Sequence, residues 1–172
     1  MSPLSRRPVP DPAGPVQESV WDYPRPAIAE PVDARLEVVF AGRTLASTAR
    51  GVRTLETSHP PTYYFPPDDV DRARLRPNGA RRSLCEWKGR ARYFDVVDEA
   101  TGRVAEAACW CYPDPSASFA ALAGFLAFYP AAMDACRVDG ELVRPQPGGF
   151  YGGWITSGVA GPFKGEAGTM GW

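Results

Sequence analysis

The two lysines of this chain occur in nearly the same local sequence. Positive charge is carried by arginine at seventeen positions and by lysine only at Lys88 and Lys164, within the strings EWKGR and GPFKGE. A compact ammonium beside an aromatic residue, with a glycine that lets a ligand approach, is suited to binding an anionic group or to acting as a nucleophile. Lysine stems lying over aromatic rings at glycine turns would produce the same strings.

Two further side chains could take part in chemistry with the first lysine, one of them close to it in the sequence. Cys85 lies three residues before Lys88 and would share a strand face with Trp87. Its thiolate would be stabilised by the ammonium, whereas a buried structural cysteine is the alternative. His59, the single histidine, precedes two prolines and is either a base brought to the site by the fold or a loop residue with local hydrogen bonds.

Acidic residues supply a second kind of candidate chemistry. Glu56 ends a predicted strand, and with Lys88 and Cys85 it completes the set of candidate catalytic residues. Asp69 and Asp71 form a D-x-D pattern, which occurs in metal-dependent nucleotidyl transfer, but a solvated turn or helix start is the ordinary explanation for acids in a polar, proline-flanked loop. The four cysteines include no CxxC pair, so we predict free thiols, no metal site and no cofactor.

Aromatic residues form the third group. The string GGFYGGW (148–154) lacks the glycine order of dinucleotide-binding loops, so we interpret it as an aromatic flap whose glycines permit tight turns. Such side chains could wall a pocket for a flat ligand, or they could form the core. The predicted ligand-binding residues are Tyr63, Tyr64, Trp87, Lys88, Tyr151, Trp154 and Lys164.

Short strands must position these residues. Alternating apolar residues predict a hairpin over 36–48, short strands over 52–56 and 62–65, and a three-stranded meander over 83–112. The pair Asp139-Gly140 predicts another hairpin.

One principal helix is predicted over 115–129. Asp114 is a suitable N-cap, and Pro115 suits the first helical position. Apolar side chains then recur at spacings of three and four residues before Pro130: Phe119, Leu122, Leu126 and Tyr129. The expected fold is therefore mainly β with one helix.

A length of 172 residues leaves room for one domain. Residues 1–33 are rich in proline and predict an arm that docks through Trp21 and Tyr23, while residues 34–172 predict a single mainly-β domain with a glycine- and aromatic-rich tail from about residue 145. A net charge of −1 offers no overall basic field for nucleic acid. Because no 18-residue apolar stretch occurs, we expect a cytoplasmic protein without membrane contact.

Several strings together resemble a family of domains of unknown function, DUF427. They occur in the expected order and cover most of the chain after residue 18: VWDYPRP, LETSHPPTYYFP, SLCEWKGRARYFDV, WCYPDP, VDGELVRPQPGGFYGGWIT and GPFKGEAGTMGW. The resemblance implies a bacterial or fungal cytosolic protein similar to the β-tent (Mss4-like) group, in which two small antiparallel sheets meet at a pocket. Members of that group often carry a four-cysteine zinc site, which the missing CxxC pairs argue against here. The family is sometimes labelled a nucleotidyltransferase.

The function predicted from these features is small-molecule binding in an aromatic, lysine-lined pocket. One alternative is nucleotidyl or other group transfer, with Lys88 or Lys164 on phosphate and Glu56, Asp69 or Asp71 as acid or metal ligand. Another is a protein-interaction module or homodimer formed through the arm and exposed aromatic residues.

Overall fold

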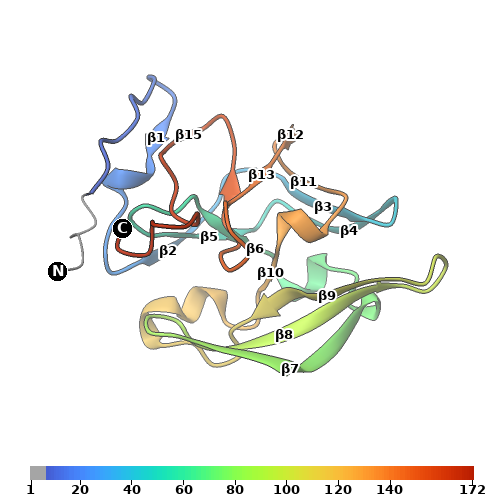
Figure 1. Cartoon of the computed structure of the whole chain (residues 1–172). Coiled ribbons are helices and arrows are strands. Elements are labelled where there is room, and N and C mark those ends of the chain that lie inside the picture. Colours follow the sequence, from blue (N-terminus) through green and yellow to red (C-terminus); the bar gives the residue numbers. More distant parts are fainter. Residues whose placement is uncertain (1–6) are drawn as a thin grey trace.

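The computed structural model describes residues 7–172 as short strands joined by turns (Figure 1). No helix within these residues has the length and apolarity needed to cross a membrane. The strands are β1 (Glu18–Ser19), β2 (Ile28–Pro31), β3 (Leu36–Phe40), β4 (Arg43–Thr48), β5 (Val52–Leu55), β6 (Thr62–Tyr64), β7 (Leu75–Cys85), β8 (Gly89–Asp98), β9 (Arg103–Cys111), β10 (Leu126–Phe128), β11 (Ala135–Val138), β12 (Glu141–Leu142), β13 (Arg144–Pro145), β14 (Trp154–Ile155) and β15 (Val159–Ala160).

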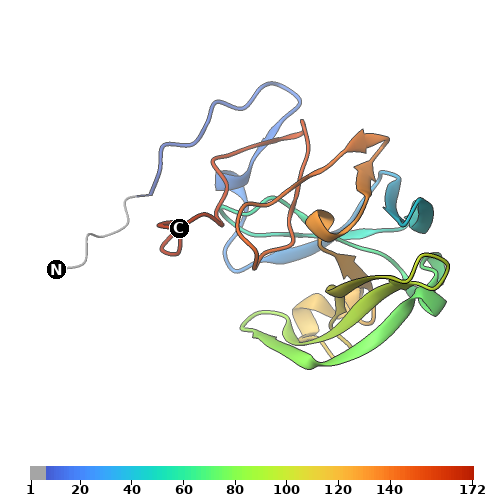
Figure 2. The ribbon, with the colours of Figure 1, turned by 45° about the vertical axis from the view of Figure 1, so that its right-hand side comes forward.

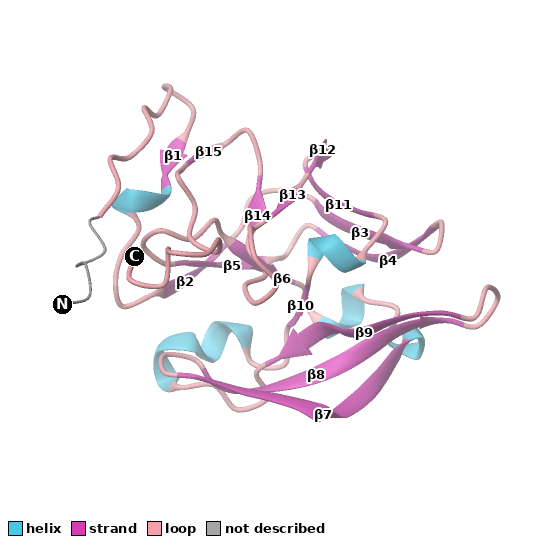
Figure 3. Cartoon of the chain, viewed as in Figure 1, coloured by secondary structure: helices cyan, strands magenta, loops and turns pink. Residues whose placement is uncertain are grey.

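The mainly-β prediction is confirmed, but the described strands form five sheets rather than two. Two sheets have four strands, in the orders β10-β9-β8-β7 and β12-β11-β3-β4, and a third has the order β2-β5-β6. The pairs β13-β14 and β1-β15 complete the set, and β1 runs parallel to β15. The sheet that contains β7 to β9 forms a layer of its own below the other strands (Figure 3).

The predicted helix over 115–129 is wrong. Only Ala117–Leu122 is helical, as 3₁₀ turns with non-helical dihedral angles at Phe119, and Gly124 at a φ of 73° interrupts the run. Leu126–Phe128 instead form β10, which pairs with β9 and is buried along its whole length. A strand buried on both faces has a continuous apolar run, which helical spacing can imitate.

Successive side chains of β9 point alternately into two hydrophobic cores, one on each face of the strand. Cys109 and Cys111 point into one core with Phe128, whereas Trp110 points into the other core with Tyr64. All four cysteines are free thiols, as predicted. Burial raises the pKa of the Cys109 and Cys111 thiols, so both stay protonated and act as small apolar side chains.

The N-terminal segment is joined to the body by strands and by a third core. Its strand β1 pairs with β15, and β2 pairs with β5. Val20, Trp21 and Tyr23 are buried there against Leu55 and Ile155. The first described residues and the C-terminal tail lie on the same side of the molecule (Figure 2). The domain boundary after residue 33 stays a prediction.

Candidate functional site

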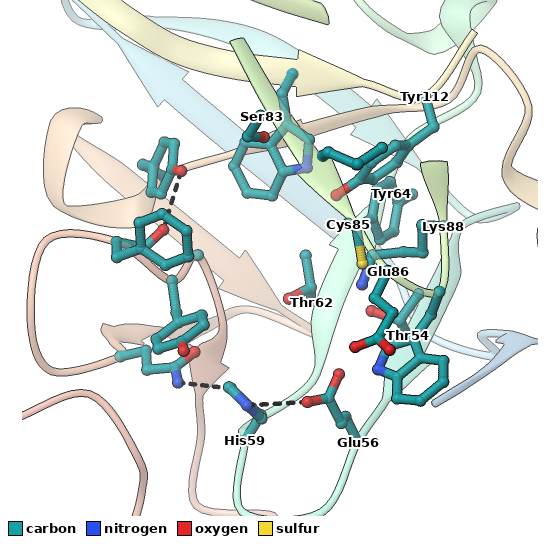
Figure 4. Close-up of a pocket in the computed structure, with 18 of the residues that line it drawn as sticks. Thr54, Glu56, His59, Thr62, Tyr64, Ser83, Cys85, Glu86, Lys88 and Tyr112 are labelled. Carbon is teal, nitrogen blue, oxygen red and sulfur yellow. Dashed lines mark hydrogen bonds and ion pairs between the residues drawn. The ribbon is translucent and has the colours of Figure 1, made fainter. Parts of the chain in front are cut away.

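A pocket of about 240 Å³ opens between the end of the β7–β8 hairpin, strands β5 and β6, and the glycine-rich loop (Figure 4). Tyr64, Trp110 and Tyr112 belong to its aromatic lining, with Tyr129 and Tyr151 at other points of the wall. Polar side chains interrupt this lining: Glu56, His59, Cys85, Lys88 and Gln146. The pocket therefore combines flat apolar surfaces with charged and hydrogen-bonding groups.

Six of the nine residues predicted to be catalytic or ligand-binding meet in this pocket, and His59 joins them. Trp87 and Lys88 come from the turn of the β7–β8 hairpin, and Tyr151 comes from the glycine-rich loop more than sixty positions later. The residues brought together are Glu56, Tyr64, Cys85, Trp87, Lys88 and Tyr151.

Two aromatic residues expected in the pocket wall lie in the core instead. Tyr63 and Tyr64 are neighbours on β6, so they point to opposite faces, and only Tyr64 faces the pocket. Trp154 is fully buried, with its ring centroid 5.1 Å from that of Tyr63, and its Nε1 donates to the carbonyl of Phe128 at 3.2 Å. Both side chains hold the sheets together rather than lining the pocket.

Lys164 also lies outside the pocket lining. Its Nζ donates to the Trp172 carbonyl at 3.3 Å and lies 5.7 Å from the Tyr151 ring centroid. Its backbone N–H donates to the Ser58 carbonyl. The two lysines therefore do not share one site, although both approach pocket aromatics.

The aspartates of the D-x-D pattern lie away from the pocket. Asp69 accepts a hydrogen bond from Thr48 at 2.7 Å and pairs with Arg50 at 3.3 Å. The Thr48 hydroxyl, helped by Arg50, keeps the pKa of Asp69 below its ordinary value. Asp71 is exposed, and its backbone N–H donates to Leu45. In residues 7–172, no group of three or more His, Cys, Asp or Glu side chains is arranged to hold a metal ion.

The ammonium of Lys88 has no anionic partner within the described chain. Its Nζ lies 5.9 Å from the ring centroid of Tyr112 and 5.8 Å from that of Phe119. Ser116 fixes the turn, because its N–H donates to the Lys88 carbonyl and its hydroxyl donates to the Trp87 carbonyl. The ammonium thus makes no ion pair within residues 7–172, and the carboxylate of Glu56 is close enough only for its charge to be felt.

A hydrogen-bonded chain runs from the glycine-rich loop to Glu56. Gln146 accepts from the Gly153 N–H at 3.1 Å and donates to the Lys164 carbonyl at 2.8 Å, so two backbone groups set the orientation of its amide. The amide nitrogen consequently faces His59 Nδ1, 3.0 Å away, which must accept. The proton of the neutral ring is then on Nε2, 3.1 Å from a carboxylate oxygen of Glu56.

Glu56 is therefore held as a carboxylate at the pocket wall. Burial by itself would raise the pKa of Glu56, but the hydrogen bond from His59 and the positive charge of Lys88 outweigh it and lower the pKa. One oxygen is engaged by His59, and the other makes no hydrogen bond within residues 7–172. The pocket thus presents a free acceptor oxygen and a free ammonium.

The second glycine pair of GGFYGGW, Gly152 and Gly153, allows close packing. A side chain at Gly152 would collide with the Trp110 ring, and a Cβ at Gly153 would lie 2.5 Å from the Gln146 amide oxygen and 2.7 Å from the Pro60 carbonyl. These glycines let the loop lie directly on the pocket wall, where the Tyr151 ring contacts the His59 ring edge-on at 4.7 Å between centroids.

Tyr129 and Gln146 are among the pocket residues that were missed by the sequence reasoning. Tyr129 was assigned to the predicted helix, although its ring lies 4.5 Å from that of Trp110 between centroids. Gln146 stands between two prolines in a polar segment, and this flanking is the only local sign that its backbone is constrained.

Comparison with known families gives one match. A family model described as "Domain of unknown function (DUF427)" matches residues 28–139. This span contains Glu56, His59 and Lys88, but it ends before Gln146 and Tyr151. No curated protein matches the chain.

Proposed function

The chain belongs to the DUF427 family, and we propose that it is a small-molecule-binding protein whose pocket takes a flat molecule with an anionic group. The observation that carries this proposal is the ammonium of Lys88, which lies among aromatic rings without an anionic partner in the described chain. A carboxylate or phosphate on the ligand would supply that partner through a charge-assisted hydrogen bond.

The shape and lining of the pocket support a compact, planar ligand. Its volume of about 240 Å³ is smaller than the roughly 300–1,000 Å³ of sites for drug-sized molecules. Trp87, Trp110 and Tyr112 offer ring faces and edges on which a flat body could stack.

Glu56 and Tyr112 would select for polar groups on the same ligand. The free carboxylate oxygen of Glu56 accepts a hydrogen bond from a ligand N–H or O–H. Tyr112 is buried, and its hydroxyl makes no hydrogen bond within residues 7–172. A ligand with one anionic end and one donor would therefore pair with more of the pocket than a simple aromatic acid.

We also propose that the fold belongs to the β-tent (Mss4-like) group. Several small antiparallel sheets around a shared pocket are consistent with the β-tent (Mss4-like) group. Group transfer is the second candidate function for the pocket, with Lys88 on the transferred anion and Glu56 as proton acceptor.

Thermal unfolding in the presence of matched ligand pairs tests the proposal. Aromatic carboxylates and phosphates are compared with their neutral amides and alcohols, on the native protein and on Lys88→Met, which keeps an apolar stem. At least one anionic compound should raise the Tm of the native protein, while its neutral counterpart should not. The shift should disappear in Lys88→Met.

Lys164→Met is the matched control, because Lys164 also lies over an aromatic ring but does not line the pocket. It should keep the ligand response. Equal loss of response in the two lysine variants, or no response of the native protein to any anionic compound, would contradict the proposal.

A further inference from the structure

Positive charge is concentrated on one hairpin. Residues 76–92, which span most of β7 and the start of β8, contain six cationic side chains and one acidic side chain. Their net charge is +5, and since the whole chain has a net charge of −1, the other residues total −6. The near-neutral total therefore conceals a strongly basic hairpin, whose Arg82, Arg90 and Arg92 remain exposed when Arg76, which pairs with Asp95, and Lys88, which lies in the pocket, are set aside.

Arginines face one another across this hairpin. Arg82 is directly opposite Arg92, and Leu84 is directly opposite Arg90. The three arginines are exposed, and within residues 7–172 none of them makes an ion pair or a side-chain hydrogen bond. Like charges directly opposite on paired strands are destabilising. A bound anion would therefore reduce the repulsion between Arg82 and Arg92 and stabilise the hairpin.

The same hairpin ends its sheet. β7 is the last strand in the order β10-β9-β8-β7, and in Figure 1 it is the lowest strand of the molecule. Within the described chain, the backbone of residues 82–85 pairs only with β8, so the outer edge of this segment is unpaired. Charged residues often protect such an edge against aggregation. A single arginine on β7 would be enough for this protection, so it does not explain why Arg82 has a second arginine, Arg92, directly opposite.

An exposed leucine distinguishes this surface from a simple anion site. Leu84 is 74% exposed and lies between the arginines. A groove of about 710 Å³ runs beside it, lined by Arg81, Arg82, Arg90 and Arg92 as well as Leu84. A partner that covers this groove must supply both negative charge and apolar surface.

We infer that β7 is a docking edge for an extended acidic segment of a partner protein, which pairs with residues 82–85 as an added strand. Alternate residues of such a segment lie on one face, so an acidic residue meets Arg82 and an apolar residue meets Leu84. A nucleic acid backbone would neutralise the arginines, but its phosphates would leave Leu84 uncovered and the β7 backbone unpaired. The observations therefore favour a peptide over nucleic acid.

Fluorescence anisotropy with a designed peptide tests this inference. The probe is a fluorescein-labelled peptide with the sequence Thr-Glu-Thr-Leu-Thr-Glu-Thr, and its comparison peptide replaces both glutamates with lysine. The acidic peptide should bind the full-length protein, and the lysine peptide should not. Binding should weaken as salt increases, because exposed charges are screened.

Charge reversal on the hairpin locates the binding. Arg82→Glu and Arg92→Glu should each weaken binding of the acidic peptide by about tenfold or more. Arg144→Glu, at an exposed arginine of β13, is the matched control and should change binding less than twofold. Thermal unfolding of each variant verifies that it is folded.

Backbone pairing is tested separately. A peptide with N-methylated backbone amides at its three central residues should lose binding, and amide exchange of residues 82–85 should slow when the unmodified peptide is bound. Undiminished binding of the methylated peptide would overturn the added strand. No binding of the acidic peptide, or equally tight binding of a ten-nucleotide thymidine DNA strand, would overturn the inference.

Discussion

Two lysines with the same neighbours have different environments in this molecule. Lys88 and Lys164 each follow an aromatic residue and precede a glycine, yet only Lys88 lines the pocket. Lys164 contributes its backbone carbonyl, which orients Gln146 and through it His59. The chemistry of a side chain therefore depends on the residues that the fold places opposite it, and local sequence does not contain them.

The Glu56 carboxylate gives a pH-dependent prediction at this scale. Because its pKa is lowered in the folded state, the carboxylate stabilises the fold above the unfolded-state pKa, and this contribution is lost as pH falls through the folded-state pKa. Glu56→Gln should therefore reduce the free energy of unfolding by about 1–2 kcal/mol at pH 7. The difference between the two proteins should shrink below about pH 4. Urea unfolding at several pH values measures it.

Glu86→Gln is the control for that series. Glu86 also lines the pocket but is exposed and makes no ion pair within residues 7–172. Its removal should change stability little at any pH. A pH-independent difference between the native protein and Glu56→Gln would show that the His59–Glu56 pair does not stabilise the fold.

Among the structural elements, the glycine-rich loop is the one whose shape the pocket depends on most directly. Gly152 and Gly153 lie against Trp110, Gln146 and Pro60, and there is no room for a side chain at either position. A Cβ at Gly149, in the same loop, would have no neighbouring atom within 4 Å. The loop therefore provides a test pair that differs only in packing.

Gly153→Ala should lower the free energy of unfolding by about 1–3 kcal/mol, because the added methyl must displace the Gln146 amide or the Pro60 backbone. Gly149→Ala should be neutral within about 0.5 kcal/mol. Chemical unfolding of the two variants measures the difference. Equal stability of the two would mean that the loop does not press on the pocket wall.

Over the whole molecule, the third core joins the two ends of the described chain. Trp21 is buried, its Nε1 donates to the Pro162 carbonyl at 3.0 Å, and its ring lies 5.6 Å from that of Trp172 between centroids. The N-terminal segment thus holds the C-terminal tail, and this tail includes Lys164, which orients Gln146. Docking of the arm is in this way connected to the pocket.

Trp21→Ala should lower the free energy of unfolding by about 3–5 kcal/mol, as expected for a large aromatic removed from a core. Met170→Ala, at a side chain that is 78% exposed in the same tail, should have little effect. Urea unfolding followed by circular dichroism compares the two. A Trp21→Ala protein as stable as the native one would contradict the docking of the N-terminal segment.

The sequence alone was sufficient to predict the hairpins and the mainly-β class. Asp139 and Gly140 have φ angles of 47° and 81°, the turn that their residue types favour, because such preferences act between neighbours in the chain. Alternating apolar residues likewise predicted β3 and β4, since the side-chain period of a strand is a local property.

The tertiary structure alone decided which residues share the pocket. Whether Leu126–Phe128 formed a helix or a strand depended on pairing with β9, and whether Tyr63 or Tyr64 faced the pocket depended on which face of β6 met the core. The partnership of Gln146 with His59 joins positions 87 residues apart. These outcomes are set by the packing of distant segments, and the burial that drives this packing acts between surfaces that no local pattern identifies.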